Sequence, residues 1–402
     1  MKKKILITAC SLEIGGIERS LVGLLDVFDY DAYDVDVLLF SRKGELLPFL
    51  SPRCTLLPEI PQCATLLTPI RTVLRQGHFL LGGARVWTHW KLSRKYPATG
   101  DPQTADGVTF ATLQSFWDTS IRFMPKLPGT YDAAISFMWP HHFVAQKVRA
   151  EKKLAWVHTD YTIAILDKEK DAAVWKQFDR IAAVSDECGE AFLKVYPQFR
   201  DRLTTVENIL SPAFVRKSAL ESEPEEMRGT DVPKLVSVGR LCYQKAFDRA
   251  ARVARILKDR GVPFRWYVVG FGGEEQALRA LIDELDVGDC FRLLGKKSNP
   301  YPYIRACDLF VQPSRYEGKA VTVREAQMLA KPVLITDFQT ARSQVRDGFD
   351  AVIVPQDEHA IADAITSLLG DADKRRQLSE NARATDYGNA SEAEKIYRMI
   401  EG

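Results

Sequence analysis

The chain has 402 residues, of which 46% are hydrophobic and 27% are charged, with a formal net charge of +2 at pH 7. These fractions are those of a soluble globular protein, and the length exceeds one typical domain, so two domains with substantial cores are expected. So small a net charge gives no reason to expect nucleic acid as a partner.

Cysteine usage and the N-terminus indicate a cytoplasmic protein. The seven cysteines form no CxxC pair, and most sit in apolar runs, which predicts buried thiols in a reducing compartment. The apolar run behind Lys2–Lys4 is about five residues long, too short for a secretory signal. No later segment approaches the ~20 apolar residues of a membrane span.

The first half opens as a nucleotide-binding type of α/β domain. A strand at Lys4–Ala9 leads through the turn Gly15-Gly16 into a helix at Ile17–Phe28. Paired glycines let backbone approach a ligand closely, although they also form ordinary tight turns. Further strands are expected at Val35–Phe40, Tyr131–Phe137, Lys153–Val157, Ile181–Val184 and Leu203–Val206, with a helix at His142–Arg149.

A basic, aromatic-rich insertion interrupts this alternation at about residues 60–128. Pro61–Gly100 contains no acidic residue, and cations alternate with aromatic and aliphatic side chains in its 71–96 region. Such a stretch suits an anionic membrane surface; the alternative is an insertion that packs its aromatics on the core and leaves its cations solvated. Gly82-Gly83 is expected to interrupt any helix here. The residues in question are Arg71, Arg75, Phe79, Leu80, Leu81, Arg85, Trp87, Trp90, Lys91, Arg94, Lys95 and Tyr96.

His158 follows the strand at Lys153–Val157, at the edge where parallel sheets bind ligands. An imidazole there can hydrogen-bond a sugar hydroxyl or a phosphate, and Asp160 could orient it or meet an acceptor. A histidine at a strand end is also commonly structural.

A polar, acidic run between Ser218 and Pro233 is the best candidate for a linker. The expected organisation is an N-terminal domain over 1–212, a linker over 213–232 and a C-terminal domain over 233–385. A last helix within 386–402 is expected to pack back on the N-terminal domain. The second half repeats the first, so two Rossmann-like domains are expected to face one another across a cleft.

Strand, loop and helix follow in the second half at Leu235–Val238, Gly239-Arg240 and Phe247–Arg260. The turn Gly270–Gly273 lacks the third glycine of the dinucleotide fingerprint, because Glu275 stands there, so hydride transfer is poorly supported. Further strands are expected at Phe264–Val269, Cys290–Leu294, Asp308–Gln312 and Pro332–Thr336, and helices at Glu274–Leu285, Ala360–Leu369 and Ser391–Ile400.

The stretch Pro313–Ala326 is the strongest candidate site. It follows the buried strand expected at Asp308–Gln312, and it is predicted to form a loop and the start of a helix, whose unpaired N–H groups and dipole favour phosphate. Glu317 and Glu325 flank the turn, and carboxylates accept hydrogen bonds from hydroxyls while they repel phosphate. A nucleotide sugar fits this pattern. The alternative is structural, since Thr322 and Glu325 have the spacing of a capping box.

Together these motifs resemble the family 4 glycosyltransferases, retaining enzymes of the two-domain GT-B fold. The resemblance covers most of the second half and scattered points of the first. It rests on Glu317 to Glu325, on Val238-Gly239-Arg240-Leu241 with Lys245, on Asn299–Phe310, on Gly15-Gly16 and on His158.

The resemblance implies a role for each of these residues. Arg240, Lys245 and the N–H groups of Ala320, Val321 and Thr322 would hold the diphosphate of the donor, as Gly15 and Gly16 would from the first domain. Glu317 would lie under the donor sugar and Glu325 would bind the ribose. His158 would contact the donor from the first domain, and domain closure would bring these groups together. Transfer in this family commonly needs no metal, and no sequence cluster here argues for one.

Lys319 departs from the family, in which small or aromatic residues are common at this position. It is expected either to add a cation near the phosphates or to be a solvated loop lysine. The leading hypothesis is a peripheral enzyme of the inner membrane face. It would move a hexose from a nucleotide sugar, expected to be UDP-linked, to a lipid-linked acceptor in bacterial surface polysaccharide synthesis. The alternatives are a transferase for a soluble acceptor and a silent nucleotide-sugar-binding module.

Overall fold

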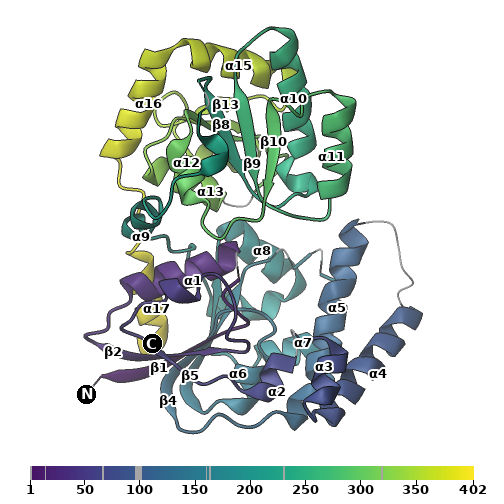
Figure 1. Ribbon diagram of the computed structural model, residues 1–402. Coiled ribbons are helices and arrows are strands. Elements are labelled where there is room, and N and C mark those ends of the chain that lie inside the picture. The colour runs from purple at the N-terminus through teal and green to yellow at the C-terminus, as the bar shows by residue number, and fades with distance from the viewer. Residues whose placement is uncertain are drawn as a thin grey trace. The chain divides into compact units, whose positions relative to one another are not determined.

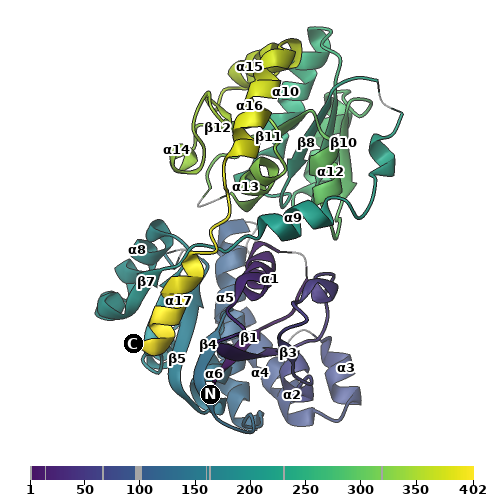
Figure 2. The same cartoon turned by 90° about the vertical axis from the view of Figure 1, so that its left-hand side faces the viewer.

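The computed structural model describes residues 2–13, 15–65, 68–95, 102–159, 161–162, 164–229, 231–317 and 320–402, apart from the side chains of 95 and 102–109. The chain divides into two compact units (Figure 1). Unit 1 runs to Leu210 and includes Asn389–Gly402, while unit 2 is Ser211–Gly388. Figure 2 shows the same elements from the side.

The described strands of unit 1 form one parallel sheet in the order β3-β2-β1-β4-β5-β6-β7. Its central strands are buried on both faces, as apolar runs such as Ile5–Ala9 predict for a sheet covered by helices. The strands are β1 Lys3–Ala9, β2 Tyr33–Leu39, β3 Thr55–Leu56, β4 Tyr131–Ser136, β5 Ala150–Val157, β6 Arg180–Ala183 and β7 Leu203–Thr205.

Helices cover both faces of this sheet. The aromatic side chains of α5, α6, α7 and α8 build the core on one face, around Trp117, Phe143, Trp175 and Phe192. The C-terminal helix α17 packs against β5. The helices of unit 1 are α1 Gly16–Val27, α2 Pro61–Ala64, α3 Ile70–Arg75, α4 Phe79–Lys95, α5 Pro102–Ser120, α6 His142–Lys147, α7 Lys168–Trp175, α8 Asp186–Val195 and α17 Glu392–Glu401, with 3-10 turns η1 Leu47–Phe49, η3 Ile121–Phe123 and η4 Pro197–Arg202.

The insertion is a set of helices, and the expected interruption at Gly82-Gly83 is wrong, because α4 continues through both glycines. The physical reason is packing between α3 and α4. A Cβ at Gly82 would lie 2.5 Å from Cδ2 of Leu74, so the missing side chain lets the two helices approach closely. This contact outweighs the helix-propensity cost of about 1 kcal/mol for each glycine.

Unit 2 contains a second parallel sheet in the order β10-β9-β8-β11-β12-β13. Helices α10, α11 and α15 form the core on one face, and α9, α12 and α13 contact one another. The elements are α9 Pro212–Ser218, β8 Lys234–Val238, α10 Phe247–Asp259, β9 Arg265–Val269, α11 Glu275–Glu284, β10 Phe291–Gly295, α12 Tyr301–Ala306, β11 Leu309–Gln312, α13 Val321–Met328, β12 Val333–Thr336, α14 Ala341–Gln344, β13 Val352–Val354, α15 Glu358–Gly370 and α16 Ala372–Ala384, with 3-10 turns η5 Glu225–Met227 and η6 Tyr243–Lys245.

The segment expected to be a linker, 213–232, belongs instead to unit 2. It opens with α9, whose N-terminus is capped by the Ser211 hydroxyl. Its acidic residues have partners on the body of the unit: Glu226 pairs with Lys297, and Glu223 pairs with Arg305. The acidic residues of this segment therefore form surface ion pairs with unit 2, and the segment is not an unattached linker.

Among the described helices, none has the length and apolar character needed to cross a membrane.

Candidate functional site

The candidate site of unit 2 lies at the point in its sheet where the order of successive strands reverses. β8 and β11 are neighbours, with β9 and β10 on one side and β12 and β13 on the other. Loops that leave two such strands diverge, which opens a crevice at their carboxyl ends. Gly239-Arg240 leaves β8 and Pro313–Glu317 leaves β11, so the topology brings two sequence motifs 73 or more residues apart to one place.

Glu317 is the centre of a hydrogen-bonded cluster in this crevice. Nζ of Lys245 lies 2.6 Å from its Oε1, and the Ser314 hydroxyl donates to the same oxygen at 2.6 Å. Nε2 of Gln244 donates to Oε2 at 3.1 Å. Only 4% of the Glu317 side chain and 14% of the Lys245 side chain are exposed, so the ion pair is largely shielded from water. The structure thus brings together the two charges that the sequence predicted as parts of one site.

Glycines let the loops of this crevice pack closely. A Cβ at Gly270, directly after β9, would lie 1.8 Å from the carbonyl oxygen of Gly239. A Cβ at Gly272 would lie 2.3 Å from the carbonyl oxygen of Leu241. The glycine-rich turn is therefore a structural support for the Gly239-Arg240 loop.

Helix α13 begins at Val321, with Ala320 as a residue of extended backbone before it. No side chain caps this helix, and the Thr322 hydroxyl donates to Oε1 of Gln312, so the capping-box interpretation of Thr322 and Glu325 is wrong. The N–H of Ala320 donates to Oε1 of Gln344 at 3.0 Å, which corrects its expected availability to phosphate. The N–H groups of Val321 and Thr322 donate no hydrogen bond to the described part of the chain.

Glu325 is fully buried on α13, and the hydroxyl of Tyr301 donates to its Oε1 at 2.8 Å. This contact ties α13 to α12. The tyrosine occupies one carboxylate oxygen, so Glu325 has a structural role in this structure, and its expected contact with a ribose stays a prediction.

Two further cations of unit 2, Arg240 and Lys319, were predicted to lie near the donor phosphates. Arg240 is exposed after β8 and makes no ion pair within the described residues. Its guanidinium is thus available to an anion. Lys319 lies outside the described residues.

In unit 1, Gly15 precedes α1 and Gly16 is its first residue. The carboxyl group of Glu18 lies against Gly15, because a Cβ there would be 2.0 Å from Oε2. Burial raises the pKa of Glu18, and a carboxylate at this turn repels phosphate. The roles of Gly15 and Gly16 in donor binding therefore stay predictions, with less support than the turn at α13.

His158 directly follows β5, and its Nε2 lies 2.8 Å from the carbonyl oxygen of Phe137. Since a carbonyl can only accept, Nε2 carries the proton and Nδ1 is an acceptor; Nδ1 is buried without a partner in the described residues. Burial lowers the pKa of His158 to about 4. The neutral ring can accept a hydrogen bond from a hydroxyl at Nδ1, whereas it is a poor acid at neutral pH. Asp160 lies outside the described residues.

The lowered pKa of His158 predicts a loss of stability in mild acid. The unfolded imidazole binds a proton near pH 6.5 and the folded one only near pH 4, so its contribution is complete above pH 6.5 and disappears as pH falls to about 4. The loss attributable to this residue is expected to be about 2 kcal/mol. Urea unfolding at pH 7 and pH 4.5 measures it.

His158→Gln is the matched control, since an amide can still donate to Phe137 and does not titrate. Its stability is expected to fall less steeply between these two pH values than that of the unaltered protein. Parallel losses in the two proteins would contradict the assignment.

The sequence analysis did not single out several residues of the site. Ser314 and Gln244 hold Glu317, Tyr301 holds Glu325, and Gln344 holds the N–H of Ala320. Ser314 lies three residues before Glu317, and Gln244 is adjacent to Lys245, so inspection of neighbouring polar residues could have suggested both. Tyr301 and Gln344 come from elements distant in sequence and needed the fold.

Comparison with protein families matches residues 221–385 to the family described as Glycosyl transferases group 1. The match covers most of unit 2 and includes every predicted site residue of that unit.

Curated relatives carry related names. The chain is 29% identical over 289 residues to D-inositol 3-phosphate glycosyltransferase of Nocardia farcinica, covering 65% of this chain and 64% of the relative. It is 30% identical over 148 residues to the putative colanic acid biosynthesis glycosyltransferase WcaL of Salmonella typhimurium, covering 34% and 35%. Both matches span less than two thirds of the relative's length.

Solved structures extend the similarity to the whole chain. HepE from Anabaena, solved in complex with UDP, superposes with a TM-score of 0.64 at 15% identity and covers 100% of each chain. At this identity the similarity concerns the fold. It confirms the expected GT-B class, an α/β protein of two Rossmann-like units.

Proposed function

We propose that the chain, whose residues 221–385 match the family described as Glycosyl transferases group 1, is a retaining family 4 hexosyltransferase. Its donor would be a nucleotide sugar, UDP-linked as in the complex of HepE from Anabaena, and its acceptor a lipid-linked saccharide in bacterial surface polysaccharide synthesis. The name of WcaL supports the polysaccharide assignment.

The observation that carries this proposal is the cluster around Glu317. A carboxylate and an ammonium lie 2.6 Å apart in the crevice between β8 and β11, and the N–H groups of Val321 and Thr322 at the start of α13 donate no hydrogen bond within the described residues. A ligand with hydroxyls at one end and phosphates at the other can engage both kinds of group. Hydroxyls donate to Glu317, while phosphates accept from Lys245 and from the helix N-terminus.

In the proposed reaction the positive groups act on the leaving diphosphate. When the bond between the sugar carbon and the phosphate oxygen breaks, negative charge grows on that oxygen, and Arg240 and Lys245 stabilise it. The acceptor hydroxyl oxygen forms the new bond on the same face of the sugar and gives its proton to the leaving phosphate. Neutral His158 would accept a hydrogen bond from a donor hydroxyl. We propose that no metal is required, since these cations supply the charge.

A panel of nucleotide sugars tests the function. Each donor is titrated by calorimetry and then incubated with a lipid-linked saccharide acceptor, with and without a chelator, while nucleotide release and product are followed. One UDP-sugar is expected to bind and turn over equally with the chelator present. Binding without transfer or donor hydrolysis would indicate the silent nucleotide-sugar-binding module instead. Transfer to a soluble saccharide alone would select the soluble-acceptor alternative.

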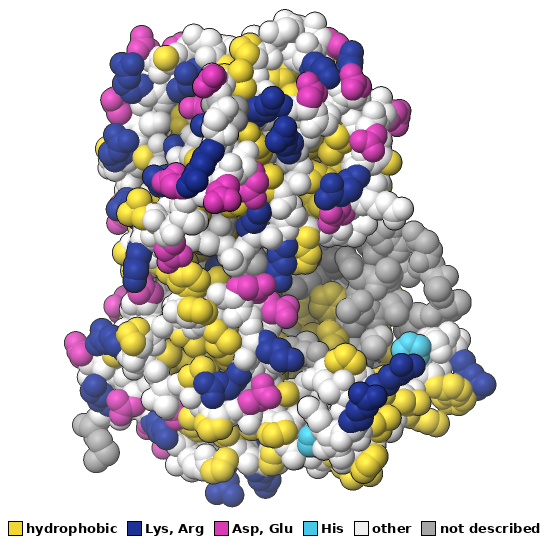
Figure 3. All heavy atoms as spheres, in the orientation of Figure 1, with side chains coloured by type: hydrophobic (Ala, Val, Ile, Leu, Met, Phe, Trp, Pro, Cys, Tyr) yellow, Lys and Arg dark blue, Asp and Glu magenta, His cyan; other side chains and the backbone are white. Residues whose placement is uncertain are grey.

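We also propose that unit 1 lies on an anionic membrane surface through α4. This helix has apolar residues on two faces, which explains its imperfect periodicity in the sequence. Leu81, Ala84 and Leu92 are buried against the unit. The other face exposes Phe79 (68%), Leu80 (67%), Val86 (53%), Trp87 (57%) and Trp90 (44%). Figure 3 shows yellow apolar side chains and dark blue cations together over α4 at the lower right.

The exposed tryptophans of this face, Trp87 and Trp90, contact each other at the surface and do not pack on the core. The rings of Trp87 and Trp90 stack at 5.0 Å, and the guanidinium of Arg94 lies 4.2 Å from the Trp90 ring centroid. Exposed tryptophans with adjacent cations suit the boundary of an anionic bilayer, where rings enter the headgroup region and cations meet phosphates. Arg85 is excluded from this role, because it donates to the carbonyl groups of Thr65 and Thr68.

Flotation with vesicles tests the membrane proposal. Binding to phosphatidylcholine vesicles that contain phosphatidylglycerol is expected to exceed binding to pure phosphatidylcholine, and to weaken with salt. Replacing Arg71, Arg75, Lys91 and Arg94 by Gln is expected to lower the partition coefficient by roughly 1,000-fold, since each of the four cations contributes about 1 kcal/mol. Replacing Trp87 and Trp90 by Ser is expected to weaken binding to both vesicle types.

Leu220→Ser is the control, because Leu220 is equally exposed (71%) but lies in unit 2. It is expected to leave the partition unchanged. Equal binding to neutral and anionic vesicles, or binding that survives loss of the four cations, would contradict the proposal.

A further inference from the structure

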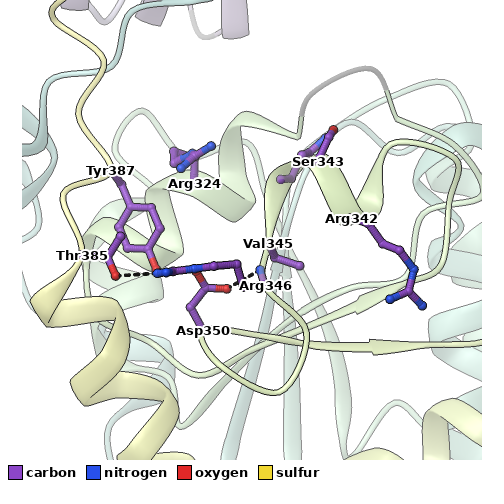
Figure 4. A pocket seen from close by; sticks show the side chains of 9 residues that line it. Arg324, Arg342, Ser343, Val345, Arg346, Asp350, Thr385 and Tyr387 are labelled. Atoms are coloured by element: carbon purple, nitrogen blue, oxygen red, sulfur yellow. Dashed lines mark hydrogen bonds and ion pairs between the residues drawn. The ribbon is translucent and has the colours of Figure 1, made fainter.

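A polar pocket of about 250 Å³ lies in unit 2, outside the crevice between β8 and β11. Its wall comes from α13, from α14 and the loop after it, and from the segment after α16 (Figure 4). The lining includes three arginines, Arg324, Arg342 and Arg346, with Asp350 and Tyr387.

The single carboxylate of the wall is already engaged. Asp350 is 2% exposed; its Oδ1 accepts from the N–H of Arg346 at 2.8 Å and its Oδ2 from the Tyr387 hydroxyl at 2.9 Å. Burial, together with the neighbouring Asp350, raises the pKa of Tyr387 to about 12, so the phenol stays protonated and keeps donating. The Asp350 Oδ2 also lies 3.4 Å from Nε of Arg346, so this carboxylate offsets charge on Arg346 and leaves the charges of Arg324 and Arg342.

The guanidinium groups of Arg324 and Arg342 retain hydrogen-bond donors that a ligand can use. Arg324 lies 5.3 Å from the ring centroid of Tyr387 and makes no ion pair among the described residues. The nearest carboxylates to Arg342 lie at 3.8 and 4.0 Å and are solvent-exposed, so these pairs are weak. Figure 4 shows Arg346 reaching from one side of the pocket toward Thr385, below Arg324 and Tyr387.

We propose that this pocket binds a phosphate group, as a second anion site distinct from the crevice at Glu317. Guanidinium forks bind phosphate oxygens in pairs, and a space of about 250 Å³ admits a phosphate ester with its neighbouring carbons. The phosphate can belong to a soluble ester or to a lipid headgroup. Both sources offer the same oxyanion to the same arginines.

The pocket is connected to the loop that carries Glu317. Thr340, before α14, donates from its hydroxyl to the carbonyl oxygen of Glu317 at 2.8 Å. Gln344, at the end of α14, accepts from the N–H of Ala320 at 3.0 Å. α14 therefore touches the loop on one side and supplies Arg342 to the pocket on the other. A phosphate held by Arg342 and Arg324 stabilises this arrangement, so it changes the apparent affinity for the donor; this consequence rests on the proposed function.

Calorimetry tests the site directly. Inorganic phosphate and glycerol 3-phosphate are titrated into a variant carrying Arg240→Gln and Lys245→Ala, which removes the cations of the crevice. Binding is expected to persist in this background and to weaken at least ~10-fold when Arg324→Gln or Arg342→Gln is added. Phosphatidylcholine vesicles with and without phosphatidic acid form the lipid arm. Because α4 is itself expected to bind anionic vesicles, binding to the vesicles with phosphatidic acid identifies the lipid source only if Arg324→Gln weakens it. Binding of the soluble ester identifies the soluble source.

Arg279→Gln is the matched control, since Arg279 is a similarly exposed arginine of unit 2 with a carboxylate partner on its own helix. It is expected to bind phosphate like its background. Unchanged binding in both Arg324→Gln and Arg342→Gln, or no binding in either arm, would overturn the proposal. The donor KM is then measured with and without glycerol 3-phosphate: a shift that Arg324→Gln abolishes supports the connection to the loop, and an unchanged KM refutes it. The calorimetric result stands whether or not the chain transfers a sugar.

Discussion

Glu317→Gln is expected to lower turnover at least ~100-fold while the protein remains folded, and Lys245→Ala is expected to have an effect of similar size. Each change removes one charge of the pair that is joined at 2.6 Å in the crevice. Gln keeps the size of Glu317 and can still accept from Ser314 and Gln244, but it no longer stabilises positive charge that develops on the sugar. Ala at 245 removes a cation from the leaving diphosphate. Steady-state assays with the active donor measure kcat and KM.

Each substitution leaves the other member of the Lys245–Glu317 pair charged and unpaired in a shielded site, which is expected to lower the free energy of unfolding by about 3 kcal/mol. Urea unfolding is therefore measured alongside each assay. The matched control is Glu226→Gln, which breaks the Glu226–Lys297 ion pair at the surface of the same unit. Its turnover is expected to equal that of the unaltered protein. Near-normal turnover in both Glu317→Gln and Lys245→Ala would remove the site assignment, whereas a loss in the control as well would point to general destabilisation.

Regular secondary structure was predictable because each unit repeats buried strand, glycine turn and amphipathic helix. The strand expected at Lys4–Ala9 is β1, and the helix expected at Phe247–Arg260 is α10, each within one residue. The insertion was less predictable, since α4 buries one apolar face and exposes another, which removes the single-face periodicity. The acidic run before Pro233 was misinterpreted because its partners, Lys297 and Arg305, lie far along the chain.

The site was predictable to the extent that its residues follow strands. Glu317 and Lys245 were assigned together through the family resemblance, and the structure shows why they meet, since β8 and β11 are neighbours in the sheet. The contacts that hold them could not be assigned, since Gln344 reaches Ala320 through the geometry of α14 alone. The spacing of Thr322 and Glu325 suggested a capping box. In the structure the Thr322 hydroxyl instead donates to Gln312, a contact that local spacing does not predict.

Gly270→Ala is expected to destabilise unit 2 by about 3 kcal/mol and to disturb the loop that carries Arg240. A Cβ there would lie 1.8 Å from the carbonyl oxygen of Gly239, and a backbone atom cannot move aside as a flexible side chain can. Relief requires β9 and the Gly239-Arg240 loop to separate, although the N–H of Gly239 donates to Val269 and that of Leu241 donates to Phe271. Donor affinity should therefore fall together with stability, as urea unfolding and donor calorimetry would show.

Gly273→Ala separates this steric effect from the general effect of replacing a glycine. Gly273 lies in the same turn, and a Cβ there would meet no atom within 4 Å. Because alanine lowers the conformational entropy of the unfolded chain and meets no clash here, the free energy of unfolding is expected to stay within about 1 kcal/mol of that of the unaltered protein. Donor affinity is expected to be normal. Equal destabilisation by the two substitutions would show that the turn needs glycine for its own backbone. A selective loss in Gly270→Ala would instead identify the contact with Gly239 as the support of the phosphate-side loop. It would also explain why a glycine-rich turn without the complete dinucleotide fingerprint lies beside the site.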